Sequence, residues 1–195
     1  MRYIIGLTGG IACGKSVVSD IFEKQGIPII DTDIISRKVM SEGQDCYSEV
    51  VSNFPDAIEN GSISRSLLKK IVFNDKQKLA ILNSITHKYI KQETIKEIEK
   101  QNDIAVVVVP LMFESGFDKL CDCVICVSAD KNERINRIVN RDNISRELAE
   151  NIINSQLSDE EREAKSDYII ANNSSVEDLT NKANKVLKSI LEKQK

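Results

Sequence analysis

The stretch at residues 6–20, GLTGGIACGKSVVSD, decides the fold of this chain. Its residues 9–16 spell Gly-x-x-x-x-Gly-Lys-Ser, directly after an apolar run predicted to be a strand at 3–7 and directly before a helical pattern. In such a loop the glycines let backbone N–H groups curl around phosphate oxygens, and the helix N-terminus adds partial positive charge. Lys15 can reach the β- and γ-phosphates, while the Ser16 hydroxyl can bind Mg²⁺. The pattern therefore predicts a nucleotide-binding phosphate loop rather than an ordinary glycine-rich turn.

The composition is that of a globular protein with no general affinity for nucleic acid or for a membrane. The 195 residues fit one domain, 1–195, and the formal net charge of −3 gives no broad attraction to polyanions. The five cysteines are odd in number and do not resemble a secreted disulfide framework, so we expect a cytoplasmic protein. The longest apolar run, 104–113, is too short to span a bilayer, and glycines interrupt the N-terminal apolar stretch, which argues against a signal peptide.

Apolar strand patterns alternate with helical patterns along most of the chain, which predicts an α/β fold with a five-stranded parallel sheet. The predicted strands are 3–7, 27–31, 104–109, 123–127 and 167–171. The predicted helices are 15–25, 131–140, 146–156 and 176–193, the last with Ser175 as its N-cap. Residues 43–101 break the alternation, because they contain no convincing strand but several helical patterns, including a long one from near Asp75. We expect this segment to be a helical insertion.

Three absences favour a small kinase over other phosphate-loop proteins. No glycine has Asp three residues before it, and Asn-Lys-x-Asp is missing, so a GTPase is disfavoured. The third strand ends in Pro110, and the first acidic residue after it is Glu114, whereas a motor or large ATPase usually closes that strand with an acid. A kinase instead excludes water and presents another hydroxyl to the nucleotide.

Asp31 and Asp33 follow the second predicted strand, at the carboxyl edge of the sheet where ligands of open α/β proteins bind. One carboxylate there could accept the proton of an acceptor hydroxyl while the other orients Mg²⁺ or its waters. The competing interpretation is that both residues only cap the next helix, a common role for Asp. The neighbouring phosphate loop favours the functional interpretation.

Three arginines, Arg134, Arg137 and Arg141, recur at spacings of three and four and therefore share one helical face. Such a run usually forms a solvated charged face. Arginine forks also match the three oxygens of a transferred phosphoryl group, and a positive lid over ATP would exclude water. We favour Arg137 and Arg141 as lid arginines, within a lid region of about 131–165, and expect Arg134 to pair with a neighbouring carboxylate.

Weaker signals come from the other residue types of interest. His87 is the single histidine and lies on a helical pattern with no visible triad, so it is not predicted to be a general base. At most, His87 would contact a phosphate or hydroxyl group of the acceptor, and Arg65 would contact an anion. The run CDCVIC at 121–126 could suggest zinc, but a fourth ligand is missing nearby. On a strand, Cys121 and Cys123 would share one face and Cys126 would lie on the other, which favours buried structural cysteines. The thiol of Cys13, inside the loop, is a candidate for a modification that blocks phosphate binding.

Beyond these local patterns, the chain resembles the dephospho-coenzyme A kinase family. The resemblance rests on IIGLTGGIACGKS, GIPIIDTDIISRKV, GSISRSLLKKIVF, VVVVPLMFESG, NRIVNRD and SDYIIANNSS, which occur in that family's order up to about residue 175. It implies a P-loop nucleoside-triphosphate-hydrolase-like kinase fold with a helical acceptor subdomain and a lid. It also implies a transferase that uses ATP, with Mg²⁺, to phosphorylate the ribose 3′-hydroxyl of dephospho-coenzyme A, the final step of coenzyme A biosynthesis.

The resemblance assigns roles to matching positions in this sequence. Asp33 would be the base, assisted in catalysis by Lys15 and Arg141. ATP would be held by Gly9, Gly10, Ile11, Ala12, Cys13, Gly14, Lys15, Ser16, Arg137, Arg141, Asn172 and Asn173, the two asparagines lying near adenine. The acceptor would meet Thr8, Asp31, Asp33, Arg65 and His87, and Mg²⁺ would be held by Ser16, with Asp31 as a further candidate.

The chain departs from the family's usual pattern at four positions. Ala12 replaces a glycine, so its backbone must avoid a positive φ or accept strain. Cys13 replaces a serine, Thr32 stands between the two acids where the family has alanine, and Lys88 follows His87 where the family has proline. Because Lys15, Ser16 and Asp33 are retained, we expect an active enzyme.

Two other functions stay open on the residues alone. One is a P-loop kinase that acts on another small nucleotide or metabolite, since spacing does not identify the acceptor. The other is a nucleotide-gated regulatory protein that binds ATP without transferring phosphate, although pure binding would not require the acid pair at Asp31 and Asp33.

Overall fold

The computed structural model describes residues 2–73 and 75–194. They divide into two compact units, which we call the sheet unit (2–30 and 101–194) and the helical unit (31–100). Within the described residues, no helix is both long and apolar enough to cross a membrane. The prediction of one domain with an insertion at 43–101 stays a prediction.

A five-stranded parallel sheet forms the centre of the sheet unit, with the strand order β2-β5-β1-β6-β7. The strands are β1 (Tyr3–Thr8), β2 (Ile29–Asp31), β5 (Ile104–Val108), β6 (Cys123–Ser128) and β7 (Tyr168–Ala171). In the register of β1, Tyr3 lies opposite Ile104 on one side and Ile5 opposite Cys123 on the other. The central strands are almost entirely buried, as the continuous apolar runs of a parallel sheet covered on both faces require.

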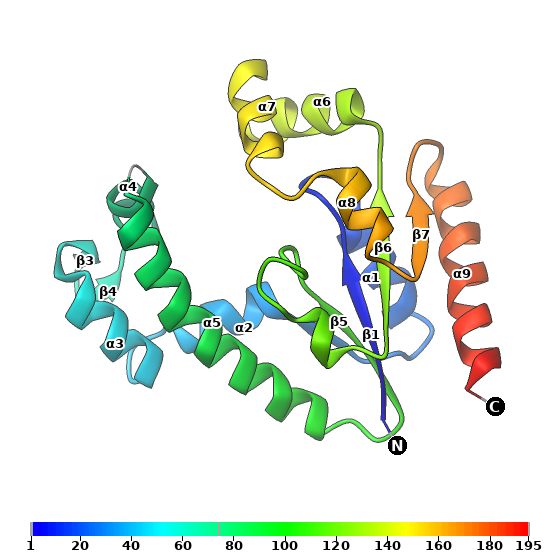
Figure 1. The fold of residues 1–195 in the computed structure, drawn as a ribbon, viewed down its shortest axis with the longest axis horizontal. Helices are drawn as coiled ribbons and strands as arrows, with labels where there is room; N and C mark the ends of the chain where they lie inside the picture. The colour runs from blue at the N-terminus through cyan, green and yellow to red at the C-terminus, as the bar shows by residue number, and fades with distance from the viewer. Residues whose placement is uncertain (1, 74, 195) are drawn as a thin grey trace. The chain divides into compact units, whose positions relative to one another are not determined.

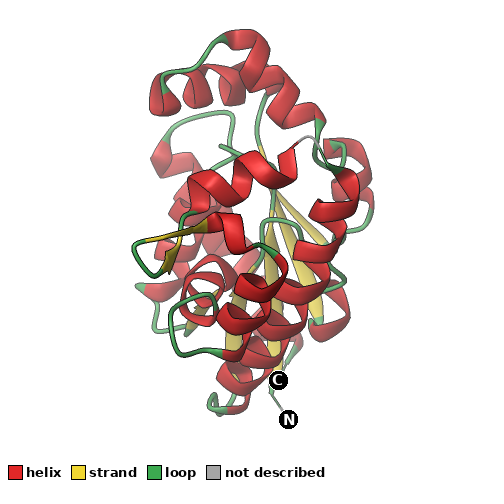
Figure 2. Ribbon diagram, turned by 90° about the vertical axis from the view of Figure 1, so that its left-hand side faces the viewer, coloured by secondary structure: helices red, strands yellow, loops and turns green. Residues whose placement is uncertain are grey.

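Helices cover this sheet and provide its core contacts (Figures 1 and 2). They are α1 (Lys15–Glu23), α8 (Asp159–Ala164) and α9 (Val176–Lys193), with a 3₁₀ turn at Asp118–Leu120. Helices α6 (Lys131–Asp142) and α7 (Arg146–Asn154) lie beyond the end of the sheet and pack with each other in a separate apolar cluster (Figure 1). Helix α9 begins where the Ser175 hydroxyl accepts the Asp178 N–H, and it buries Leu179, Ala183, Leu187 and Ile190 on one face. That stripe joins Phe22 of α1 and Ile5 of β1 in one apolar core.

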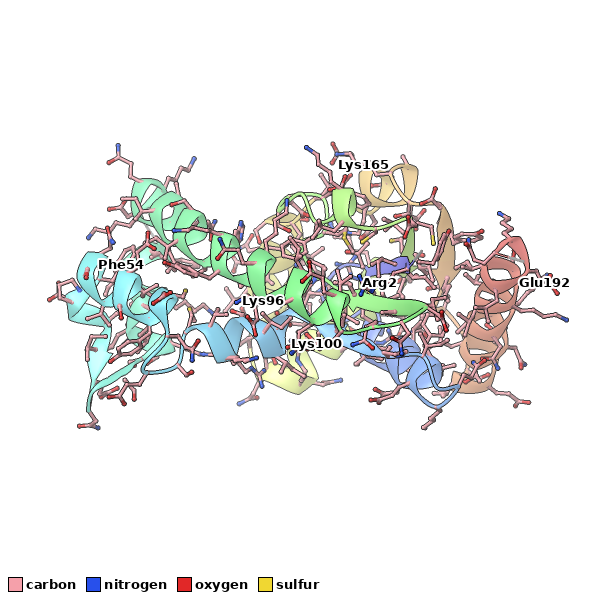
Figure 3. All side chains as sticks on the ribbon, turned by 90° about the horizontal axis from the view of Figure 1, so that it is seen from below. Arg2, Phe54, Lys96, Lys100, Lys165 and Glu192 are labelled. Atoms are coloured by element: carbon pink, nitrogen blue, oxygen red, sulfur yellow. The ribbon has the colours of Figure 1, made fainter. Side chains whose placement is uncertain are left out.

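The helical unit consists mainly of four helices and a small hairpin. Its elements are α2 (Thr32–Val39), α3 (Asp45–Asn53), a 3₁₀ turn (Pro55–Ala57), β3 (Ile58–Glu59), β4 (Ser62–Ile63), α4 (Arg65–Phe73) and α5 (Lys76–Glu99). The long helix α5 starts at Asp75, whose carboxylate accepts the N–H groups of Gln77 and Lys78 at 3.0 Å. Its far end carries exposed cations, among them Lys96 and Lys100 (Figure 3).

The five predicted strands and the helices near 15–25, 75, 131–140, 146–156 and 176–193 are confirmed. The expectation of no strand within 43–101 is wrong, because β3 and β4 pair antiparallel across Asn60 and Gly61. These two residues have φ of 52° and 79°, the positive pair that an Asn-Gly hairpin turn needs, so the dipeptide was the sequence signal for the hairpin. Helix α8 was also missed, because its six residues are too few to show a helical period.

Candidate active site

The phosphate loop at 9–16 connects β1 to α1 and leaves the start of that helix open. Gly14 is the N-cap of α1 with φ +100°, and no side chain caps the helix. Six other described helices, α2, α5, α6, α7, α8 and α9, have an Asp or Ser side chain at this position, while α3, with Gln44 there, also lacks a side-chain cap. The first N–H groups of α1 are therefore left for an anionic ligand, as at phosphate-binding helix termini.

Lys15 follows the N-cap and turns back over the loop. Its ammonium donates to the carbonyl oxygens of Gly9 and Gly10, at 2.7 and 3.4 Å. The charge is therefore held at the loop itself, within the span that a bound phosphate chain would occupy. Ser16, the next residue, is exposed at the first turn of α1.

Side chains from distant segments hold the outward-facing backbone groups of the loop. Arg137 donates to the Ala12 carbonyl at 3.1 Å, and the buried Asn172 donates to the Cys13 carbonyl at 2.9 Å. Gln156 accepts the Ile11 N–H at 3.0 Å. Arg137 and Asn172 were sequence predictions, and the structure brings both to the loop. Gln156 was missed, since an isolated Gln carries no recognisable pattern.

The three arginines of α6 have different environments. Arg134 is buried and binds the Ile11 carbonyl and Asp159. The expected pairing with a carboxylate is found, but the expectation of a neighbouring partner is wrong, because Asp159 lies on α8. Arg137 lies against the loop, as described above. Arg141 is exposed and pairs with its neighbour Asp142 at 2.7 Å, so its lid role stays a prediction.

Two further predicted residues have mainly supporting contacts. The Asn173 side chain accepts the Asp130 N–H at 2.8 Å, which links the turn after β7 to the start of α6. The buried Thr8 hydroxyl at the end of β1 lies 3.5 Å from the Pro110 carbonyl, at the outer limit of a hydrogen bond. Their proposed contacts with adenine and acceptor stay predictions.

The thiol of Cys13 does not face the ligand side of the loop. It is 1% exposed and packs in the apolar core with Val18 and Val127. The expectation that this thiol is open to modification is therefore wrong for the folded protein, because the loop reverses direction and turns the side chain inward. The role of residue 13 at the loop is that of its backbone.

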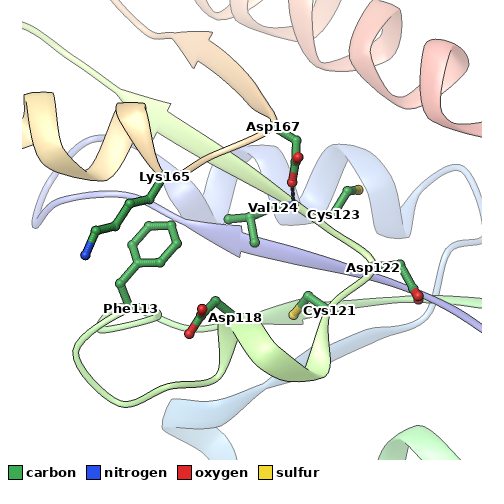
Figure 4. Close-up of a pocket in the computed structure, with 8 residues that line it drawn as sticks. All are labelled: Phe113, Asp118, Cys121, Asp122, Cys123, Val124, Lys165 and Asp167. Carbon is green, nitrogen blue, oxygen red and sulfur yellow. Dashed lines mark hydrogen bonds between the residues drawn. The ribbon is translucent and has the colours of Figure 1, made fainter.

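A cavity of about 450 Å³ lies at the amino ends of β6 and β7, away from the predicted site residues of the sheet unit (Figure 4). Asp118, Asp122 and Asp167 line it with Cys121 and Cys123, and Lys165 lies 5.7 Å from the centre of the Phe113 ring. Burial, more than the nearby acids, raises the pKa of the Cys121 thiol to about 12.

Within the described residues, no group of three His, Cys, Asp or Glu side chains is arranged to bind a metal.

This arrangement supports structural cysteines over a zinc site at 121–126. Cys123 and Cys126 are buried, as predicted. Cys121 is only partly buried, and it precedes β6 instead of lying on it, so the predicted shared strand face of Cys121 and Cys123 is wrong. The sulfur atoms of these two residues point in different directions in Figure 4.

In the helical unit, the acid pair divides into two environments. The Asp31 carboxylate accepts the Asp33 N–H at 2.7 Å and is the N-cap of α2, so the capping interpretation is confirmed for this residue. Asp33 lies in the first turn of α2 and is exposed. A cap does not preclude a second role for Asp31, since one carboxylate oxygen suffices for the cap.

Arg65 lines a pocket of about 220 Å³ in the helical unit, together with Arg37 and Tyr47. Glu42 is the one acid among the lining residues, which leaves the pocket with an excess of positive charge. His87 lies on α5 and is half-buried, and this burial lowers the pKa of its imidazole from 6.5. The neighbouring Lys88 pairs with Glu49 at 3.7 Å and lies over the Tyr89 ring.

Comparison with known proteins identifies the relatives of this chain. A family model described as dephospho-CoA kinase matches residues 3–178. The chain is 46% identical over 190 residues to the dephospho-CoA kinase of Fusobacterium nucleatum, across 96% of this chain and 98% of the relative. It is 32% identical to the solved dephospho-CoA kinase from Campylobacter jejuni, with a TM-score of 0.74 and coverage of 100% of both chains.

A more distant similarity concerns the fold alone. The shikimate kinase from Acinetobacter baumannii is 15% identical, with a TM-score of 0.60 over 99% of this chain and 95% of that one. Together with the parallel sheet and the loop, these matches confirm the predicted α/β P-loop kinase fold.

Ala12 generates the first prediction, because it has φ +61° in the position where strain was expected. Replacing Ala12 with Gly should raise the free energy of unfolding by roughly 1 kcal/mol, since glycine adopts this left-handed backbone without a Cβ clash. Equilibrium urea unfolding measures the change. The matched control is Ala80→Gly in the exposed part of α5, a substitution that should lower the free energy of unfolding by about 1 kcal/mol. A similar decrease of the free energy of unfolding in both variants would contradict the prediction.

His87 generates a pH prediction. Because burial lowers its pKa below 6.5 in the fold, the unfolded chain binds the proton first as pH falls. His87 should therefore reduce stability progressively below about pH 6.5 and have no such effect above it. We expect the unfolding free energy of His87→Gln to fall less than that of the parent between about pH 7.5 and about pH 5. Parallel stability curves for the two proteins would show that His87 does not titrate in this way.

Proposed function

This chain belongs to the dephospho-CoA kinase family and catalyses the ATP-dependent phosphorylation of dephospho-CoA, the last step of coenzyme A biosynthesis, and on this premise we propose how its residues act. The predicted family, enzyme class and reaction are confirmed. The proposal concerns the ribose 3′-hydroxyl as acceptor, the residues that hold both substrates, the metal and the compartment.

The phosphate loop is the observation that carries the proposal. The N–H groups at the start of α1 are left without a side-chain cap, and Lys15 brings its ammonium over the same loop. Backbone N–H groups and a mobile cation together stabilise the charge on three equatorial phosphoryl oxygens. Residues 9–16 would therefore hold the phosphates of ATP, with Lys15 following the transferred group.

A divalent metal fits the donor set at the end of this loop. The Ser16 hydroxyl is a hard oxygen ligand on an exposed first turn, and Mg²⁺ prefers few protein oxygens together with phosphate and water. Ser16 would hold Mg²⁺, with Asp31 as a further candidate through its carboxylate. When bound, the ion supplies charge neutralisation of the phosphates.

Asp33 would act as the base for the acceptor. It is an exposed residue in the first turn of α2, two residues after β2 ends. A carboxylate in this position would accept the proton of the 3′-hydroxyl as the oxygen attacks the γ-phosphorus. Asp31 would orient the segment, since its side chain already holds the Asp33 N–H.

Other residues would bind the two substrates. Arg137 and Arg141 would close over ATP as lid arginines and exclude water, with Arg141 changing its Asp142 partner for a phosphate. Asn172 and Asn173 would lie near adenine. Arg65, His87 and Thr8 would contact dephospho-CoA, and the positive pocket of Arg65 and Arg37 would suit the diphosphate of that molecule.

The cytoplasm is the compartment we propose, supported by five thiols that are all free. ATP and dephospho-CoA are the proposed partners, with neither nucleic acid nor a membrane, in line with a net charge of −3. The division into one kinase domain with a helical acceptor insertion at 43–101 and a lid at about 131–165 belongs to the same proposal.

Replacing Asp33 with Asn tests the proposed base. The amide cannot take the proton, so turnover of Mg-ATP and dephospho-CoA should fall about 10²- to 10⁴-fold while ATP binding is retained. ADP release with dephospho-CoA, AMP, adenosine or no acceptor measures turnover and acceptor choice, and product analysis locates the new phosphate.

The matched control is Asp45→Asn, because Asp45 is also an exposed acid in the first turn of a helix of the same unit. Near-normal turnover in Asp33→Asn would remove Asp33 from the base role. Release of ADP by the parent with AMP or adenosine instead would assign another acceptor, and ATP binding without any release would favour a regulatory protein.

Arg65 generates a separate prediction. Because its guanidinium would contribute a charge-assisted contact to the acceptor alone, Arg65→Ala should raise the KM for dephospho-CoA roughly tenfold and leave the KM for ATP unchanged. Steady-state kinetics with each substrate varied in turn measures both constants. The control is Lys69→Ala, which removes an exposed cation one turn further along α4. Equal increases of the KM for dephospho-CoA in the two variants would show that Arg65 acts only as a general surface charge.

A further inference from the structure

A buried charged cluster lies behind the phosphate loop, formed by Arg134 of α6 with Asp159 and Arg162 of α8, and we call it the Arg-Asp-Arg cluster. Both arginines are 1% exposed, while the Asp159 side chain is 32% exposed. The cluster therefore holds two buried positive charges against one carboxylate. None of its members was predicted from the sequence as a determinant of the loop.

The hydrogen bonds of the cluster form a continuous connection from α8 to the loop. Arg162 donates to the Leu157 carbonyl and to Asp159 Oδ1, each at 2.7 Å. The other oxygen of Asp159 accepts from Arg134, whose Nε donates to the Ile11 carbonyl at 2.9 Å. Each guanidinium is thus fixed at two points, and Asp159 is the shared acceptor between them.

Arg134 also lies directly against the loop at Gly10. A Cβ atom on Gly10 would clash with the guanidinium, so the missing side chain makes room for the arginine. Ile11, the next residue, is held on both sides of its backbone, because Arg134 binds its carbonyl and Gln156 binds its N–H. Gln156 and Asp159 belong to the same short segment, so this segment and α6 together determine where Ile11 lies.

Stability alone does not explain such a cluster. Burying two guanidinium groups with one carboxylate carries a desolvation cost that apolar side chains of similar volume would avoid. Among the described residues, Arg162 Nε is moreover a buried donor without a hydrogen-bond partner. A buried, incompletely satisfied network that ends on a ligand-binding loop is better explained by what it does for that loop.

We propose that Asp159 and Arg162 are positioning residues for nucleotide binding, acting through Arg134 on the backbone of the phosphate loop. Arg162 orients Asp159, Asp159 orients Arg134, and Arg134 keeps the Ile11 carbonyl turned away from the side where phosphate binds. The excess positive charge lies behind the loop and favours an anion in front of it. The inference rests on the proposed role of residues 9–16 in holding ATP.

The test uses the full chain with two substitutions. Asp159→Asn keeps both arginines charged and removes the shared anion. Arg162→Met removes the outer arginine and leaves a neutral Arg134–Asp159 pair, so it avoids an unpaired buried charge and is expected to fold. The matched control is Arg146→Met, which removes an arginine from the exposed Arg146–Glu150 pair on α7.

Titration calorimetry with Mg-ATP, in the absence of acceptor, should show affinity weakened about tenfold in both cluster variants and unchanged in the control. The KM for ATP should rise accordingly, while the KM for dephospho-CoA stays within about twofold of the parent. Arg162→Lys, which retains one donor to Asp159, should recover part of the ATP affinity. A purely structural cluster would lower the melting temperature without separating the two KM values.

The outcomes distinguish this inference from the proposed function. Failure of the parent to bind Mg-ATP would contradict the proposed role of the loop itself. ATP affinity equal to the parent in Arg162→Met, whatever its melting temperature, would overturn the positioning role. Should Asp159→Asn not fold, the Arg162→Met and Arg162→Lys pair decides the question.

Discussion

A loop that presents its N–H groups to phosphate must turn its carbonyl groups the other way, and those carbonyls need donors of their own. Here three consecutive carbonyls are satisfied by side chains from elsewhere in the sheet unit. Ile11 is bound by Arg134, Ala12 by Arg137 and Cys13 by Asn172. The anion-binding shape of the loop therefore depends on donors from α6 and from the segment after β7 as much as on the loop's own glycines.

The topology of the sheet explains why these donors are available. Strand β6 lies beside β1, and β7 lies beside β6, all parallel, so the segments after β6 and β7 emerge at the edge where the loop begins. The segment after β6 leads to α6, and the one after β7 starts with Asn172, whose N–H also binds the Ser128 carbonyl at the end of β6. Neighbouring parallel strands thus bring two sequence-distant segments to one loop.

Local patterns predicted most of the fold and the centre of the site. The strands are continuous apolar runs, and the cap at Ser175 and the loop at 9–16 are short motifs whose geometry follows from the residues themselves. The sequence did not show which of the three arginines at spacings of three and four contact the loop. Helical period places Arg134, Arg137 and Arg141 on one face, but their burial depends on where the loop packs along α6, which is a tertiary property. Asp159 and Arg162 were missed for the same reason, because their burial also depends on tertiary packing.

Ala12 illustrates how an external contact can compensate for an unfavourable loop residue. A left-handed backbone costs an L-residue about 1–2 kcal/mol, whereas a hydrogen bond from a charged donor contributes about 1.5–3 kcal/mol. The carbonyl of this strained residue is the one that the Arg137 guanidinium binds. The two effects are of similar size and opposite sign, so alanine can occupy a position that glycine would fill without strain. The loop conformation is therefore a property of the loop together with α6, and a glycine count within the loop alone underestimates its capacity to bind phosphate.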